Sequence, residues 1–146
     1  MTALSDTELI VRLLIAALLG AVLGFERELR HKSAGLRTNT LIAVGAAVFT
    51  IMSTELVRDQ NGDPTRIAAQ IVTGIGFLGA GAIMRTGVGV QGLTTAATVW
   101  VNAAVGVAVG GGRYHLAFIT TGVTIAALVV LTPVEHLVEK YLVRKE

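Results

Sequence analysis

The sequence contains no cysteine among its 146 residues, which excludes disulfide bonds, thiolate metal sites and thiol redox chemistry. Charge is also scarce, because acidic and basic residues together make up 15% of the chain and the formal net charge is only +2. Aromatic residues make up 5%. The basic residues are not gathered with aromatic neighbours into a stripe, so no nucleic-acid partner is expected.

The signatures of enzymes and of cofactor sites are missing as well. The histidines, His31, His115 and His136, lie far apart in the sequence, which disfavours a histidine metal cluster. The spacing GxGxxG does occur, at residues 74–79, but inside an apolar run rather than after a strand. We therefore expect neither an enzyme nor a bound cofactor, and the sequence identifies no metal ligand.

Long apolar runs dominate the chain instead. Hydrophobic residues make up 53% of it and the mean hydropathy is +0.69, values typical of a membrane protein. The sequence predicts an all-α polytopic membrane protein with five transmembrane helices and a short amphipathic C-terminal helix. The expected organisation is a domain over residues 1–133, with spans at 9–25, 41–56, 67–84, 93–109 and 114–131, and a cytoplasmic tail helix over residues 134–146.

The first span lacks the basic flank and the cleavage pattern of a removable signal peptide, so we expect it to remain as an anchor. Arg12 lies near one end of this span, where a long cationic side chain can snorkel to the interface. The helix is expected to continue for two turns beyond the lipid. Glu26 with Arg30, and Glu28 with Lys32, have the favourable i,i+4 spacing for ion pairs.

Polar or glycine-rich segments separate the later spans. Residues 58–64 (RDQNGDP) predict a solvated turn; their acids could attract a divalent cation, but the spacing of a calcium loop is missing. Residues 85–92 (RTGVGVQG) predict either a plain cytoplasmic turn or a small re-entrant segment. The apolar face of the tail helix is expected to contain Val134, Leu137, Val138, Tyr141 and Leu142.

Glycines within the spans predict close packing of helices. Glycine is costly in a water-soluble helix. In a membrane it lets neighbouring backbones approach, and such packing drives association where lipid removes the hydrophobic driving force. The glycines expected to pack are the GxxxG pair Gly20 and Gly24 in the first span, and Gly74, Gly76, Gly79 and Gly81 in the third.

Polar residues on or near the spans are the remaining candidates for function. One expected group lies at the cytoplasmic ends of the first two helices and contains Glu26, Arg27, Arg37 and Asn39. A second group is expected to face across the third and fourth helices and contains Gln70, Thr73, Thr94, Thr95, Thr98 and Asn102. Two interpretations stay open: interhelical hydrogen bonds, or a polar path or cation site lined by oxygen atoms. The absence of an acid at the bilayer centre disfavours a proton-coupled pump.

The distribution of basic residues predicts the orientation. With five spans, one side holds four basic residues, Arg12, Arg58, Arg66 and Arg113. The other side holds eight, namely Arg27, Arg30, Lys32, Arg37, Arg85, Lys140, Arg144 and Lys145. The positive-inside rule makes the second side cytoplasmic, with the N-terminus outside and the C-terminus inside. The competing topology leaves one apolar run outside the bilayer and puts both termini on one side.

Four blocks of sequence resemble the signature blocks of the MgtC/SapB family of bacterial inner-membrane proteins, and they occur in the same order over nearly the whole chain. They are Glu26-Arg27, AGLRTNTL at residues 34–41, RIAAQIVTGIGFLGAG at 66–81 and GLTTAATVW at 92–100. The virulence proteins of this family have Asn-Thr and Trp-Cys where this sequence has Thr94-Thr95 and Trp100-Val101. Together with the end of the chain soon after the fifth span, these differences favour the short SapB/YhiD-like branch, which lacks the C-terminal soluble domain.

The resemblance implies a protein of the bacterial inner membrane that is tied to adaptation to low magnesium, acid or host-imposed stress. Such proteins are often labelled components of magnesium transporters, and MgtC itself is interpreted as a regulator of the membrane ATP synthase. Our preferred hypothesis is a non-enzymatic protein that supports Mg²⁺-linked ion homeostasis by packing in the bilayer against itself, most simply as a homodimer, or against a membrane-protein partner. The alternative is a homo-oligomeric channel or transporter for Mg²⁺, K⁺ or H⁺.

Overall fold

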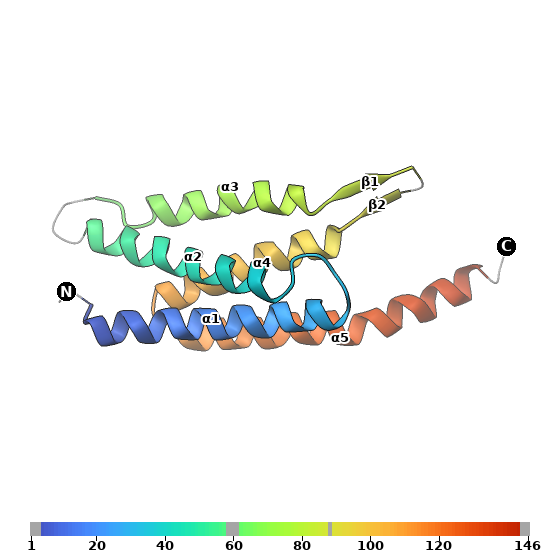
Figure 1. Ribbon diagram of the computed structural model, residues 1–146, viewed down its shortest axis with the longest axis horizontal. Helices are drawn as coiled ribbons and strands as arrows, with labels where there is room; N and C mark the ends of the chain where they lie inside the picture. Colours follow the sequence, from blue (N-terminus) through green and yellow to red (C-terminus); the bar gives the residue numbers. More distant parts are fainter. Residues whose placement is uncertain (1–3, 58–61, 88, 144–146) are drawn as a thin grey trace.

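The computed structural model describes residues 4–57, 62–87 and 89–143, and within these ranges the chain is helical apart from one short hairpin. Successive helices run in opposite directions along one long axis, so the two ends of the chain lie at opposite ends of the bundle (Figure 1). The elements are α1 (Asp6–Leu29), α2 (Leu36–Leu56), α3 (Arg66–Gly81), β1 (Met84–Thr86), β2 (Gly89–Gln91), α4 (Leu93–Gly110) and α5 (Tyr114–Val143).

The helices form three layers. Helices α2 and α4 lie in the middle, with α1 and α5 on one side and α3 on the other (Figure 1). One buried cluster joins α1, α2, α4 and α5 and includes Leu23, Ala47 and Val109. A second joins α2, α3 and α4 and includes Ile42, Ile75 and Val99. Because α2 and α4 take part in both clusters, they hold α3 on the rest of the bundle.

The helix lengths agree with the expected membrane protein for four of the five spans. Helices α1, α2 and α4, and residues 114–135 of α5, are long and apolar enough to cross a membrane. Helix α3 is apolar but has only 16 residues. At 1.5 Å per residue it is about 24 Å long, shorter than the roughly 30 Å hydrocarbon core of a bilayer.

Helix α1 extends past its apolar run as expected, and one of its two predicted ion pairs is present. Nε of Arg30 lies 2.5 Å from Oε1 of Glu26. The second prediction is wrong, because the Glu28 carboxylate accepts a hydrogen bond from the backbone N–H of Leu36 at 3.2 Å rather than pairing with Lys32. Glu28 therefore satisfies a free N–H at the start of α2, where no side chain of α2 itself forms a cap.

The segment expected to be a turn or a re-entrant loop is an antiparallel hairpin. Met84 pairs with Gln91 and Arg85 with Val90, and the hairpin extends beyond the ends of α3 and α4 (Figure 1). Gly92 follows with φ of +89°, where a Cβ would clash with the carbonyl of Ala82, so the tight return into α4 requires glycine. We refer to this end of the bundle, which also contains the α1–α2 connection, as the hairpin end.

The predicted separate tail helix is also wrong. Helix α5 continues through Pro133 to Val143, and this last part extends past the other helices (Figure 1). Its apolar residues are therefore exposed: Leu137 is 56% exposed and Tyr141 67%, and Val134 and Val138 are exposed as well. The side chain of Leu142 lies outside the described part of the chain. So do residues 58–61 and 144–146, which include Arg58, Arg144 and Lys145.

Candidate functional site

Two glycine pairs bring the middle helix α2 into close contact with its neighbours. A Cβ on Gly20 of α1 would lie 2.7 Å from the carbonyl oxygen of Asn39, and Gly24 is equally close to the start of α2. On the other side, a Cβ on Gly110 of α4 would lie 2.6 Å from the carbonyl oxygen of Ala47, and Gly106 makes a similar approach. Sequence reasoning identified the first pair and missed the second, although Gly106 and Gly110 have the same GxxxG spacing.

The α2–α4 contact contains a buried pair of asparagines. Nδ2 of Asn102 donates to the backbone carbonyl of Asn39 at 2.7 Å and to its side-chain oxygen at 3.1 Å. The Asn39 amide in turn donates to the carbonyls of Ala34 and Gly35 at the end of the α1–α2 connection. Both asparagines are fully buried, and Oδ1 of Asn102 has no hydrogen-bond donor among the described residues.

A buried charge cluster lies beside these asparagines, at the hairpin end. Arg27 is only 3% exposed, and its guanidinium donates to the Thr95 hydroxyl of α4 at 3.3 Å. Its Nη1 lies 3.6 Å from Oε2 of Glu26, which is 8% exposed and also pairs with Arg30. Neither guanidinium donates a well-directed hydrogen bond to Glu26, and Nε of Arg27 is buried without an acceptor in the described chain. The Glu26 carboxylate and Nε of Arg27 are therefore buried without hydrogen-bond partners among the described residues.

The predicted polar groups are rearranged in the structure. Glu26, Arg27 and Thr95 form one buried group between α1 and α4, and Asn39 and Asn102 form another between α2 and α4. Arg37, Gln70, Thr73 and Thr94 are exposed instead, and Thr98 is buried and bonded to its own helix. The α3–α4 contact is apolar rather than polar, because α4 turns its polar edge toward α1 and α2.

Most of the glycines of α3 do not pack against the other described residues. A Cβ on Gly74, Gly76 or Gly81 would have no described atom within 4 Å, and one on Gly79 would reach only Ala96, at 3.8 Å. The side of α3 turned away from α2 has small residues at a 4-3-4 spacing. We call Ala69, Thr73, Gly76 and Ala80, which are all exposed, the outer face of α3.

An ion-pair network at the opposite end of the bundle was not expected from the sequence. The Arg12 guanidinium contacts Oε1 of Glu8 at 2.9 Å and the carbonyl oxygen of Gly110, at the end of α4, at 2.5 Å. The Tyr114 hydroxyl donates to the same Glu8 oxygen at 3.1 Å. Arg12 therefore caps α4 rather than snorkelling, and its side chain is only 14% exposed. The i,i+4 spacing of Glu8 and Arg12 could have predicted this ion pair from the sequence.

The family model described as the MgtC family matches residues 13–137, nearly the whole chain. The chain belongs to the MgtC family. It is 52% identical over 130 residues to Protein MgtC of Brucella abortus (strain 2308), covering 89% of this chain and 54% of that protein. It is also 52% identical over 122 residues to Protein MgtC of Salmonella typhimurium (strain LT2), covering 84% and 52% respectively. The chain thus spans about half the length of these relatives. No solved structure matches it.

The family assignment confirms the resemblance found in the sequence, and the structure gives the signature blocks a common location. Three blocks of this MgtC family member, around Glu26-Arg27, residues 34–41 and residues 92–100, contribute Arg27, Asn39 and Thr95 to the buried polar contacts between α1, α2 and α4. The fourth block is α3 itself. The assignment to the short branch of the family stays a prediction.

Acidic side chains do not gather into a metal site in the part of the chain that the structure describes. No group of three or more histidines and acids is placed to hold a metal ion there. In the turn before α3, Asp63 accepts hydrogen bonds from the Thr65 hydroxyl at 2.7 Å and the Thr65 N–H at 2.8 Å. These bonds lower the pKa of the Asp63 carboxyl. The cation interpretation of this turn involves residues 58–61, which lie outside the described residues.

Proposed function

We propose that this protein supports Mg²⁺-linked ion homeostasis and stress adaptation in the bacterial inner membrane without catalysis, by binding a second copy of itself or another membrane protein through the outer face of α3. One observation carries the proposal. Gly76, at the centre of that face, is exposed and has no described atom within 4 Å of a Cβ position, whereas Gly20, Gly24, Gly106 and Gly110 are all in close contact with α2.

The energetic argument is that an unused glycine in a helix is unfavourable. Each costs about 1 kcal/mol relative to alanine in a helix interior. Gly76 obtains no compensating contact from the described residues, but a second helix lying on the outer face could approach its backbone closely. The 4-3-4 spacing of the small residues fits a helix crossing at a shallow angle. A homodimer is the simplest assembly, because a twofold axis brings the same face of both copies together.

The location of the basic residues supports the proposed orientation. The buried Arg27 and the half-buried Arg30 lie at the hairpin end, together with the exposed Lys32, Arg37 and Arg85. The positive-inside rule puts this end in the cytoplasm. Because successive helices alternate in direction, we propose that α3 crosses as a fifth span, with the N-terminus outside and the C-terminus inside.

A cation channel is the second candidate, and the buried oxygen of Asn102 favours it. Oδ1 of Asn102 has no donor among the described residues, and amide oxygens suit hard cations. The surrounding side chains argue against a path through one copy, because Arg27 and Thr95 bond to each other and Asn102 bonds to Asn39. A conducting form would therefore need an oligomer.

The two candidates are separated by cross-linking and by ion flux. The natural chain has no cysteine, so Thr73→Cys puts a single thiol on the outer face, and Val123→Cys is a matched control on the exposed side of α5. We expect oxidation in membranes to give covalent dimers of Thr73→Cys only, or a discrete adduct if the partner is another protein. Purified wild-type protein should give no Mg²⁺, K⁺ or H⁺ flux in liposomes. Saturable flux that Gly79→Leu abolishes would overturn the regulatory function and support the channel.

A further inference from the structure

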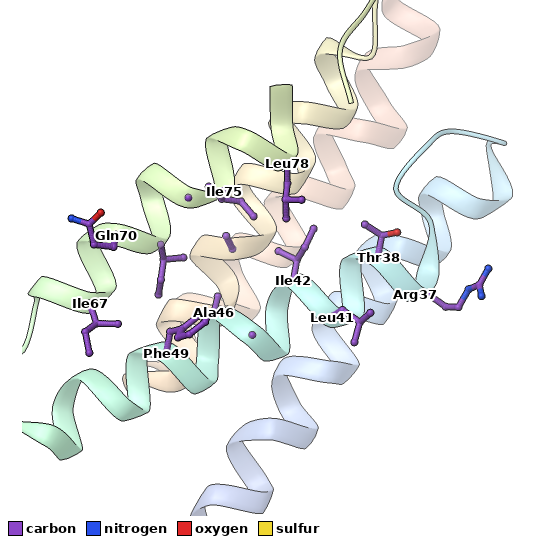
Figure 2. A pocket seen from close by; sticks show the side chains of 14 residues that line it. Arg37, Thr38, Leu41, Ile42, Ala46, Phe49, Ile67, Gln70, Ile75 and Leu78 are labelled. Carbon is purple, nitrogen blue, oxygen red and sulfur yellow. The ribbon is translucent and has the colours of Figure 1, made fainter. Parts of the chain in front are cut away.

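A lateral groove separates α2 from α3 over much of their length. It has a volume of about 810 Å³, and Ala103 of the middle helix α4 also lines it. Leu41, Ile42 and Phe49 contribute from α2, and Ile75 and Leu78 from α3 (Figure 2). Its walls are mainly apolar, and the polar residues that line it are Arg37, Thr38 and Gln70, so in a bilayer it suits a hydrocarbon chain rather than water.

Two glycines keep the groove open. Gly45 of α2 and Gly74 of α3 both line it, and neither has a described atom within 4 Å of a Cβ position. Elsewhere in the bundle glycines bring α2 into backbone contact with a neighbour, as Gly20 does. Here two glycines on adjacent helices face unfilled space. The groove therefore lacks the side chains that would otherwise close it.

An unpaired positive charge lies at one end of the groove. Arg37, near the start of α2, is exposed and has neither an ion pair nor a side-chain hydrogen bond within the described part of the chain. Figure 2 shows its side chain directed away from α3, past the end of the groove, with Thr38 beside it. A guanidinium and a hydroxyl at the end of an apolar groove complement a phosphate attached to an acyl chain.

The length of the groove fits one leaflet of a bilayer. Arg37 and Phe49 are twelve residues apart on α2, which corresponds to about 18 Å of helix. Half of a typical hydrocarbon core is about 15 Å. We propose that the α2–α3 groove is a binding site for one anionic phospholipid, with an acyl chain lying between Gly45 and Gly74 and the phosphate paired with Arg37.

The positive charge at the end of the groove favours a lipid over a second helix. A phospholipid brings a phosphate that can pair with Arg37, whereas the face of a second transmembrane helix is uncharged. An acyl chain can also reach the position between Gly45 and Gly74.

The experiment is native mass spectrometry of the purified full-length protein with phosphatidylglycerol or phosphatidylcholine of identical acyl chains. We expect the wild-type protein to retain one phosphatidylglycerol per protomer in preference to phosphatidylcholine. Arg37→Gln removes the phosphate partner and Gly74→Leu fills the groove, so each should reduce retention about tenfold. Lys32→Gln, an exposed cation at the same end, and Gly122→Leu, an exposed glycine of α5, should leave retention unchanged.

A photoreactive phosphatidylglycerol tests the wild-type chain directly and does not depend on the folding of variants. With the reactive group midway along the acyl chain, we expect cross-links at Leu41 and Leu78 in the groove in excess of those at Ile119 and Val123 on the exposed side of α5. Uniform labelling, equal retention of both lipids, or wild-type retention by Arg37→Gln and Gly74→Leu would each overturn the proposal. The proposal would also be overturned if Gly74→Leu lost the dimer but retained lipid like the wild type, because the groove would then be occupied by a second copy of the chain.

Discussion

Asn102 of α4 donates a hydrogen bond to the backbone carbonyl oxygen of Asn39 in α2, at 2.7 Å, in the fully buried centre of the bundle. That carbonyl also lies where Gly20 of α1 makes its closest approach, so three helices meet around one peptide group. A polar contact at this point specifies which faces of α1, α2 and α4 come together, a choice that small apolar side chains alone leave open.

We expect Asn102→Ala to lower the free energy of unfolding by about 1 to 2 kcal/mol, the range of interhelical hydrogen bonds in membranes. This loss of unfolding free energy should exceed the coupling energy between Asn102 and Asn39 in a double-mutant cycle with Asn39→Ala. The reason is that Asn102 still donates to the backbone carbonyl of residue 39 when the Asn39 side chain is removed. Reversible unfolding in mixed micelles measures both values. Gln70→Ala, an exposed amide on α3, is the control, and an equal effect of Asn102→Ala and Gln70→Ala would contradict the prediction.

Alanine at two glycines should have opposite effects. Gly20→Ala puts a methyl group 2.7 Å from a backbone oxygen and 2.8 Å from the Cβ of Ala43, so α1 and α2 must separate, at a cost of about 1 to 3 kcal/mol. Gly76→Ala meets no described atom and improves helix propensity, which should stabilise the monomer by up to about 1 kcal/mol. Thermal unfolding of both variants in dilute detergent measures the difference, and destabilisation of the monomer by Gly76→Ala would count against the exposed position of this glycine.

Arginine replacements at the hairpin end should distinguish a buried charge from an exposed one. Arg27→Gln leaves Glu26 buried with Arg30 as its ion-pair partner and breaks the bond to Thr95, so we expect a loss of about 3 kcal/mol or more. Arg37→Gln removes an exposed charge and should change the free energy of unfolding by less than about 0.5 kcal/mol. The comparison requires only unfolding curves of the two variants. Equal losses would show that burial of Arg27 has no special consequence.

Arg12 should stabilise the other end of the bundle through the end of α4. Arg12→Gln removes the cation from the Gly110 carbonyl and from Glu8, and we expect a loss of about 1 to 3 kcal/mol. Arg113→Gln, an exposed arginine at the same end, is the matched control. Hydrogen exchange should show faster opening of the last turn of α4 in Arg12→Gln alone, and an unchanged rate there would contradict the capping role.

The apolar runs made the helices predictable, and one of the two glycine pairs that contact α2 was recognised from its spacing. Gly20 and Gly24 followed from the GxxxG pattern, because the pattern puts both on one face whatever the partner. The partner of Asn102 was not predictable, since helical periodicity indicates a face and not the helix that covers it. We expected Asn102 to face polar residues of α3, among them Gln70, and found it bonded to Asn39 of α2, because α4 packs against α2 as well as against α3.

The hairpin and the continuous α5 show a second limit. Residues 85–92 are too few to show a clear helical or strand periodicity. The hairpin is held by backbone pairing, which leaves no distinctive pattern of side chains in the sequence. Pro133 suggested a break because proline removes a helical N–H. In α5 the helix continues through it, and the Thr132 hydroxyl bonds to the Leu128 carbonyl one turn earlier.

The orientation and the crossing of α3 can be tested with single cysteines in this cysteine-free chain. Ser33 lies in the α1–α2 connection, Thr65 precedes α3 and Gln91 is in the hairpin, and all three are exposed. If the hairpin end is cytoplasmic, a membrane-impermeant maleimide should label Thr65→Cys in intact cells, and should label Ser33→Cys and Gln91→Cys only after permeabilisation. Labelling of Gln91→Cys together with Thr65→Cys would mean that the 16-residue α3 does not cross the bilayer. Labelling of Ser33→Cys from outside would instead reverse the orientation of the whole bundle.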